Sequence, residues 1–183
     1  MVNCMSFPRP EKKHYSEDEL YAYAVEALAR RMHTVAELKR LFRARVEDAG
    51  SEYGQTLIEL VIRRLKDRGY LNDSQYAAYF SSQRRDNQKF GRRRIVTDLK
   101  IRGVHSDVIE KAVAAAFEGV SEEKQVREYL QRKRIPKPKD QKATARVFRQ
   151  LVRAGFGRKT IFTILKKWEV DEETLSALES ETG

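Results

Sequence analysis

Residues 90–104 have the sequence FGRRRIVTDLKIRGV, a short segment with a glycine near each end. Ile95 and Leu99 lie four positions apart and can share one face of a helix, because residues four apart are neighbours on a helix surface. Basic side chains occupy most of the remaining positions. The segment therefore predicts an amphipathic helix over about 91–102, with an apolar stripe turned inward and a basic exposed face.

Weaker relatives of this pattern occur on both sides of it. Thr34, Gly91 and Gly157 each open a segment with apolar residues four and eight positions further on, at intervals of 57 and 66 residues. A second similarity pairs residues 65–70 with residues 151–156 and places the third copy in a different phase. Both phases stay open at this point. Units this small cannot bury their own apolar stripes, so neighbouring units should stack.

Helix start signals divide the chain further. Ser16 and Glu19 have the spacing of a capping box, in which the two side chains satisfy free amides at a helix start, and Thr34 and Glu37 repeat it. Further caps are expected at Asn72 or Asp73, at Ser106, at Ser121 and at Asp171. Sustained period-two alternation is absent, so no sheet is expected. The predicted fold is all-α, an elongated tandem repeat of about three three-helix units with nine to ten helices. Its predicted domains are a flexible N-terminal tail (1–15), a first three-helix unit (16–71), a second (72–118), and a third helical unit with an acidic C-terminal end (119–183).

The charge is unevenly distributed. The chain carries 37 lysines and arginines against 27 acids, a net charge of +10, yet residues 84–103 alone carry +6 and residues 131–149 carry +7. Such segregation favours a polyanionic partner, although a charge run is also the ordinary composition of a solvated helix face. The candidate DNA- or filament-contacting residues are Arg84, Arg85, Lys89, Arg92, Arg93, Arg94, Lys100, Arg102, Arg132, Lys133, Arg158 and Lys159.

Other classes of protein are disfavoured. Cys4 is the only cysteine, no apolar run approaches the ~20 residues of a membrane span, and the N-terminus does not resemble a signal peptide. We therefore expect a cytoplasmic protein without membrane contact. The three histidines are scattered and no glycine-rich phosphate loop follows a strand. We accordingly expect no catalytic site, no cofactor and no metal.

One further run carries a family resemblance. Residues 68–80, RGYLNDSQYAAYF, followed by residues 91–104, resemble the central signature of bacterial RecX regulatory proteins, and the similarity extends faintly over residues 20–170. Asn72 stands where the family tends to have aspartate, and residues 1–15 and those after Val170 have no clear counterpart. The resemblance implies tandem three-helix units. It also implies a non-enzymatic role: binding the RecA recombinase filament on DNA and restraining its assembly, ATP hydrolysis and strand exchange in recombination and DNA repair.

The expected partners are the RecA filament and single- and double-stranded DNA, met without sequence preference by a monomer. Charge alone does not decide whether the arginines contact DNA phosphates or acidic protein surface. Two other functions stay open. One is a sequence-specific DNA-binding protein of helix-turn-helix type. The other, less favoured for want of an acid cluster, is an RNA-processing enzyme.

Overall fold

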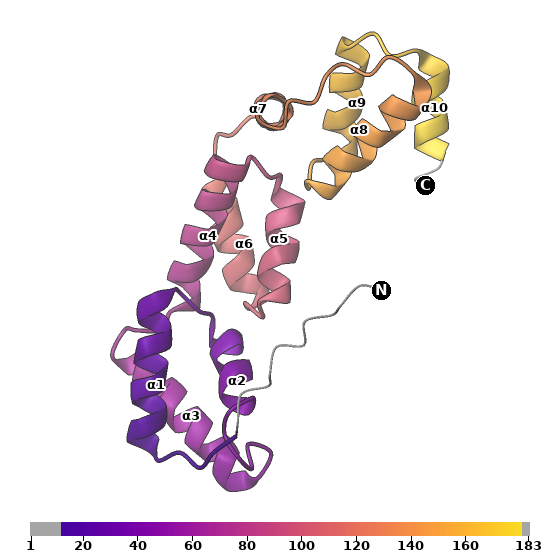
Figure 1. The fold of residues 1–183 in the computed structure, drawn as a ribbon. Coiled ribbons are helices and arrows are strands. Elements are labelled where there is room, and N and C mark those ends of the chain that lie inside the picture. Colours follow the sequence, from indigo (N-terminus) through magenta and orange to yellow (C-terminus); the bar gives the residue numbers. More distant parts are fainter. Residues whose placement is uncertain (1–11, 181–183) are drawn as a thin grey trace, which may run out of the picture. The chain divides into compact units, whose positions relative to one another are not determined.

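The computed structural model describes residues 12–180, and within that range the fold is helical (Figure 1). No strand occurs among these residues; the one β-type pairing joins Lys13 to Val46. None of the helices within residues 12–180 has both the length and the apolarity needed to span a bilayer. The ten helices of the described range are α1 (Glu17–Arg30), α2 (Val35–Arg43), α3 (Glu52–Asp67), α4 (Asp73–Gln88), α5 (Arg92–Ile101), α6 (Ser106–Ala116), α7 (Glu122–Arg132), α8 (Gln141–Arg153), α9 (Arg158–Lys167) and α10 (Glu172–Ser180).

Both predicted capping boxes are confirmed. The Ser16 hydroxyl accepts from the Glu19 amide (3.3 Å), and the Glu19 carboxylate accepts from the Ser16 amide (2.9 Å). Thr34 and Glu37 make the same exchange at the start of α2, at 3.0 and 3.2 Å. Each box satisfies two amides that the helix itself leaves without partners. The spacing of polar residues therefore determines where these two helices begin.

Two other helix starts decide the remaining questions about caps: the start of α4 shows which of two expected residues is the cap, and the start of α6 differs from the expectation. Asn72 caps α4, because its side-chain oxygen accepts from the amides of Ser74 and Gln75. The expectation that Ser106 caps α6 is wrong: His105 occupies the N-cap position without a side-chain hydrogen bond, and Ser106 is the first helical residue. The buried Val104, 6% exposed, directly precedes this cap, so its packing fixes the chain one residue earlier than the serine pattern indicates.

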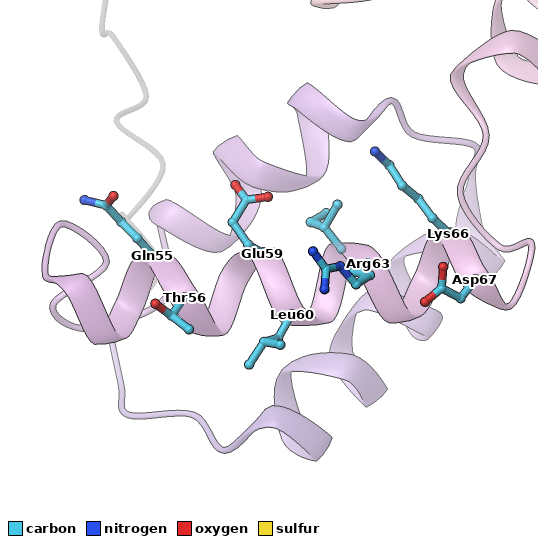
Figure 2. A pocket seen from close by; sticks show the side chains of 8 residues that line it. Gln55, Thr56, Glu59, Leu60, Arg63, Lys66 and Asp67 are labelled. Atoms are coloured by element: carbon cyan, nitrogen blue, oxygen red, sulfur yellow. The ribbon is translucent and has the colours of Figure 1, made fainter.

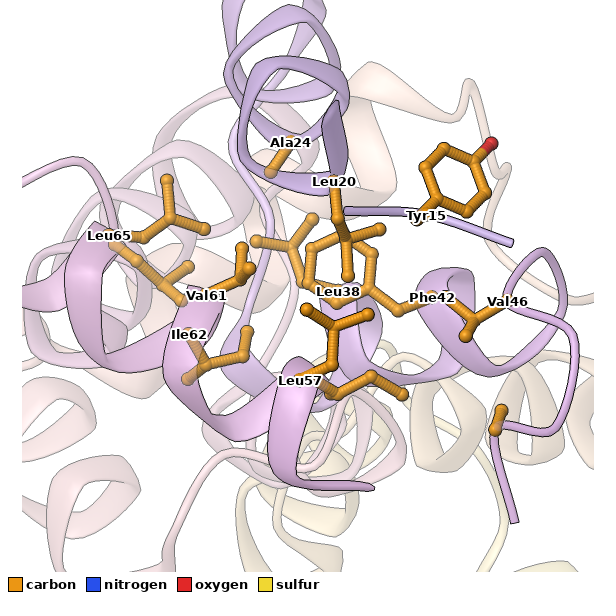
Figure 3. Close-up of a cluster of buried hydrophobic side chains, with 13 residues drawn as sticks. Tyr15, Leu20, Ala24, Leu38, Phe42, Val46, Leu57, Val61, Ile62 and Leu65 are labelled. Carbon is orange, nitrogen blue, oxygen red and sulfur yellow. The ribbon is translucent and has the colours of Figure 1, made fainter. Parts of the chain in front are cut away.

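The described residues form two compact units. The first contains the chain up to Tyr76 together with Arg102–Val104, and the second contains Ala77–Ile101 and the chain from His105 onward. In the first unit α1 and α2 both pack against α3. Their inward residues, among them Leu20, Leu38 and Phe42, are fully buried (Figure 3). Burying a side chain of this size contributes about 1.5–3 kcal/mol, which holds three short helices together.

The second compact unit has a core of its own. Helices α7, α8, α9 and α10 enclose it, with α9 packed against both α7 and α8 and α10 packed against α8. Phe148, Phe156 and Leu165 are among its fully buried side chains. In the same unit α5 packs against α6. Trp168 is half-buried at the edge of this core.

Part of the predicted tail is packed rather than loose. Lys13 donates its amide to the Arg45 carbonyl (3.0 Å) and accepts from the Glu47 amide (3.0 Å). Tyr15 is only 9% exposed and belongs to the first core. Residues 1–11 of the predicted tail, and residues 181–183 of the predicted acidic end, lie outside the described range. The division into units at 16–71, 72–118 and 119–183 stays a prediction.

Candidate nucleic-acid interface

Helix α5 occupies the glycine-framed segment that predicts an amphipathic helix. Ile95 and Leu99 are completely buried, while Arg92, Arg93 and Arg94 are exposed at its first turn. The predicted inward stripe and basic exposed face are therefore both confirmed. The helix begins with cations instead of the acids that favour a helix N-terminus, so its composition works against its own dipole. Packing of the apolar stripe has to offset that cost.

The start of α5 is held by a second glycine-containing turn. The amides of Gly91 and Arg93 donate to the carbonyls of Ala154 (2.8 Å) and Gly155 (3.2 Å), in the turn between α8 and α9. A Cβ atom on Gly91 would lie 2.3 Å from the Gly155 carbonyl oxygen, and one on Gly155 would lie 2.2 Å from the Arg94 amide nitrogen. The two backbones are in direct contact, and no side chain fits between them. We call this contact the glycine junction.

The glycine junction brings together two basic segments that lie some sixty residues apart. Arg92 and Arg93 stand at the first turn of α5, while Arg153 ends α8 and Arg158 begins α9 on either side of the contacting turn. All four side chains are exposed. Two backbone amides at the start of α5 already donate to carbonyls. An anion at this end of the helix would therefore be bound by the arginine side chains and not by these amides.

A similar contact occurs in the first compact unit. Thr34, which caps α2, donates its hydroxyl to the Arg102 carbonyl (2.7 Å), and the Val35 amide donates to the Asp73 carboxylate (2.9 Å). Gly103 has φ +76°, and a Cβ atom there would lie 2.4 Å from the Ala36 methyl group. In both places a helix start in one repeat packs directly on a glycine with positive φ that follows a helix.

Arg102 is a structural residue in this arrangement. Its guanidinium pairs with the half-buried Glu37 carboxylate, which also accepts from the Thr34 amide. The ion pair joins the segment after α5 to the start of α2 inside the first compact unit. This partner was not foreseen from the sequence, since 65 positions separate the two residues.

Three candidates on α4 and directly after it, Arg84, Arg85 and Lys89, also interact with their own chain. Arg84 lies over the rings of Phe80 and Phe90, with its guanidinium carbon 4.9 and 5.9 Å from their centres. All three candidate side chains are half-buried. Such stacking covers the flat face of the guanidinium and leaves only its edges for other contacts.

Arg85 and Lys89 have carboxylate partners. Arg85 pairs with Asp86 at 2.7 Å and donates to the Ala116 carbonyl, and its hydrogen bond to Asp86 lowers the pKa of that carboxyl. Lys89 pairs with Glu128 at 2.7 Å, and that hydrogen bond lowers the pKa of Glu128. Both cations therefore use their charge on neighbouring groups of their own chain.

The remaining candidates differ in whether their cationic groups interact with other side chains of the chain. Arg94 pairs with Asp98 one turn later (3.0 Å), an interaction worth only about 0.3–0.5 kcal/mol on a helix surface. Arg92 lies over the Phe117 ring, 5.6 Å from its centre. Of the others, Arg93, Lys100 and Lys159 make no ion pair with a described residue. The exposed candidates outside α4 are Arg92, Arg93, Arg94, Lys100, Arg132, Lys133, Arg158 and Lys159.

The structure adds residues that the candidate set omitted. Helix α8 carries four exposed cations on one face, at Lys142, Arg146, Arg149 and Arg153. Their spacing of four, three and four positions was visible in the sequence, because it is the spacing of a single helix face. The first three had entered only through the net charge of residues 131–149.

Hollows in the surface offer no competing chemistry. One hollow of about 610 Å³ lies along α3 and is lined by side chains of both charges, including Glu59, Arg63 and Lys66 (Figure 2). It is open to solvent, and Glu59 pairs with Lys39 beside it. Among residues 12–180 no group of three histidine, cysteine or acidic side chains is arranged to hold a metal ion. The exposed basic side chains are thus the best candidates for function.

Comparison with known proteins agrees with this geometry. A family model described as RecX, second three-helix domain, matches residues 72–113, the stretch that contains α4, α5 and most of α6. Regulatory protein RecX of Deinococcus radiodurans is 33% identical over 164 residues, covering 87% of this chain and 72% of the relative. Regulatory protein RecX of Myxococcus xanthus is 32% identical over 171 residues, covering 87% of each chain.

The chain belongs to the RecX family of regulatory proteins. The family resemblance seen in residues 68–80 and 91–104 is thereby confirmed.

Solved RecX structures share the fold. The crystal structure of RecX from Lactobacillus salivarius superposes with a TM-score of 0.60 at 18% identity, over 84% of this chain and 96% of that one. A second crystal structure, of a regulatory protein RecX, gives a TM-score of 0.62 at 16% identity, over 82% and 71%. The predicted all-α tandem repeat of three-helix units is confirmed, and at these identities the likeness concerns the fold alone.

Proposed function

We propose that this chain regulates a RecA recombinase filament on DNA through binding alone, restraining filament assembly, ATP hydrolysis and strand exchange. Membership of a family of regulatory proteins supports a regulatory role, and RecA is the partner that the family resemblance implies. The observation that carries the proposal is the exposed basic first turn of α5, fixed in place by the glycine junction. A nucleoprotein filament is the kind of polyanion that such a surface suits.

The physical basis is electrostatic. Arginine side chains neutralise phosphates and release condensed counterions, which gives affinity without sequence preference. Arg92 and Arg93 make no ion pair with a described residue, so binding an anion does not first require an internal pair to break. Because α5 begins directly at the junction, these side chains project from a backbone that is fixed at its first turn. Binding energy then opposes subunit addition and strand exchange, with no chemical step by this chain.

The test adds the purified protein to RecA, single-stranded DNA and ATP. We expect shorter filaments and slower ATP hydrolysis as the protein approaches saturation. Unchanged filament length and unchanged ATP hydrolysis at saturating protein would refute the proposal. Sequence-selective binding to one duplex from a random pool, with no effect on RecA, would instead favour a helix-turn-helix regulator.

A charge-reversal variant tests the contact surface. Arg92→Glu with Arg93→Glu should leave the helical circular dichroism unchanged, because both side chains are exposed, and should weaken filament inhibition by at least tenfold. The matched control is Arg43→Glu with Arg63→Glu, the same change of charge at exposed positions on α2 and α3. Equal inhibition by both variants would show that these α5 arginines are not part of the contact.

A further inference from the structure

The exposed face of α8 consists of cations. Lys142, Arg146, Arg149 and Arg153 follow one another at spacings of four, three and four residues, and all are exposed. The opposite face is buried in the second core and carries Thr144, Val147, Phe148 and Leu151. We call the four cations the α8 stripe. With a rise of 1.5 Å per residue it extends over about 16 Å.

Among the side chains that the structure describes, no carboxylate pairs with the α8 stripe. The helix contains no acidic residue, and none of the four cations makes an ion pair with a described residue. The preceding acid, Asp140, accepts from the Ala143 amide at 2.7 Å and serves as the helix cap. Arg153 donates to the Arg149 carbonyl (3.3 Å), which keeps its side chain along the helix. Like charges at these spacings repel one another, so the stripe carries a cost in the folded chain.

This pattern differs from that of Arg85 on α4 and Lys89 directly after α4, which are both paired with carboxylates of their own chain. Lys89 has Glu128 and Arg85 has Asp86, whereas the α8 stripe has no such partner among the described residues. A surface that concentrates charge without using it for folding is suited to an external polyanion.

We propose that the α8 stripe binds the phosphate backbone of nucleic acid and is the main DNA contact of this chain. The inference deepens the proposed function and rests on it for the kind of partner. Protein interfaces are centred on buried anchors, in which arginine accompanies aromatic and apolar side chains, and they are poor in lysine. The only exposed large apolar side chain on α8 is Val152, at 37%, and Phe148 is 1% exposed. The stripe therefore lacks the aromatic and large apolar anchors that accompany arginines in a protein interface.

The same composition determines the mode of binding. With no exposed aromatic ring on α8, bases have nothing on this helix to stack on, so contact is confined to phosphates and is indifferent to sequence. The stripe also ends at the glycine junction, because Arg153 directly precedes Ala154, whose carbonyl accepts from the Gly91 amide. Nucleic acid held along α8 therefore reaches the first turn of α5.

The decisive variant is Arg146→Gln with Arg149→Gln, which removes two charges and keeps good helix formers on an exposed face. Binding of the full chain to a fluorescent duplex of random sequence is measured by anisotropy from 50 to 300 mM salt. Each phosphate contact contributes a slope of about −0.9 in log K against log salt, so the variant should lose about 1.8 units of slope and about 60-fold in affinity at 0.1 M salt. Arg43→Gln with Arg63→Gln is the control and should match the unaltered chain.

Three outcomes would overturn the inference. They are unchanged affinity and slope in the α8 variant, a lower affinity with an unchanged slope, and an equal loss in the control. The alternative partner, an acidic protein surface, is indicated if the unaltered chain does not bind bare DNA but its filament inhibition depends on Arg146 and Arg149. The RecA assay is run in parallel to separate the two proposals. DNA binding that requires the α8 stripe, without any effect on the filament, would refute the proposed function and support the inference.

Discussion

Replacing Gly155 with alanine is expected to destabilise the second compact unit by about 2–5 kcal/mol. Gly155 has φ +91°, a conformation that costs an L-residue about 1–2 kcal/mol. The new methyl group would also lie 2.2 Å from the Arg94 amide nitrogen and 2.5 Å from its Cβ. Overpacking of this kind costs about 1–3 kcal/mol more, because the contacted atoms include backbone and cannot rotate away.

Two further glycines separate these contributions. Gly69 has φ +73°, and a methyl group added there would have nothing within 4 Å, so Gly69→Ala should cost only the conformational part, about 1–2 kcal/mol. Gly91 is not at positive φ, yet a Cβ atom there would lie 2.3 Å from the Gly155 carbonyl oxygen. Gly91→Ala should therefore cost only the packing part, about 1–3 kcal/mol.

Urea unfolding followed by circular dichroism measures all three free energies of unfolding. The expected order places Gly155→Ala as the most destabilised variant, by more than about 1 kcal/mol relative to Gly69→Ala. If Gly155→Ala and Gly91→Ala unfold at the same urea concentration as Gly69→Ala or later, then the backbones are not in contact. The glycine junction would then not exist as described.

The remaining predictions concern one buried histidine and one helix cap. His33 is 8% exposed, and its pKa is lowered mainly by this burial and further by the charge of Arg31. As the pH falls, His33 therefore takes up its proton in the unfolded chain before it does so in the folded one. The free energy of unfolding should consequently fall as the pH drops below about 6.5. Urea midpoints at pH 7.5, 6.5 and 5.5 should show a smaller acid loss in His33→Gln, and identical losses would contradict the assignment. Glu122 accepts from the Gly157 amide (2.9 Å) and the Thr160 hydroxyl at the start of α9, so Glu122→Ala should cost about 1–2 kcal/mol. Glu118→Ala, at an exposed residue, is the control in the same unfolding assay and should be neutral within about 0.5 kcal/mol.

Local features of the fold were predictable from the sequence. The capping boxes at Ser16 and Thr34 depend on residues three positions apart, so the sequence spacing alone predicts these contacts. The inward positions of Ile95 and Leu99 follow from helix periodicity in the same way. Ser106 shows the limit, since the buried Val104 determined the cap instead of the best local capping residue.

Contacts between distant segments were not predictable. Asp73 was expected only as a possible cap of its own helix, and it bonds the Val35 amide instead. Gly155 lies in the segment 151–156, which resembles residues 65–70, but its partner Gly91 lies 64 positions away and no local signal pairs them. Tertiary packing decides these cases, because the close approach of two backbones depends on how whole helices stack.

The sequence predicted that the candidate site is basic and which segments form it, but not which individual cations are unpaired. Charge counting located both basic segments, yet it treated Arg102 and Lys89 as equivalent to Arg93. The structure distinguishes them, because Glu37 and Glu128 pair with the first two. The α8 stripe was within reach of the sequence, because its four cations have the same helix-face spacing that predicts the inward stripe of α5.

The most direct test of the central claim is an electron-microscopic reconstruction of RecA on single-stranded DNA with this protein at saturation. The account predicts added density along the helical groove of the filament, with the segment containing α5 and α8 turned toward the DNA. Filaments that show no added density, while the protein remains free in solution, would contradict it.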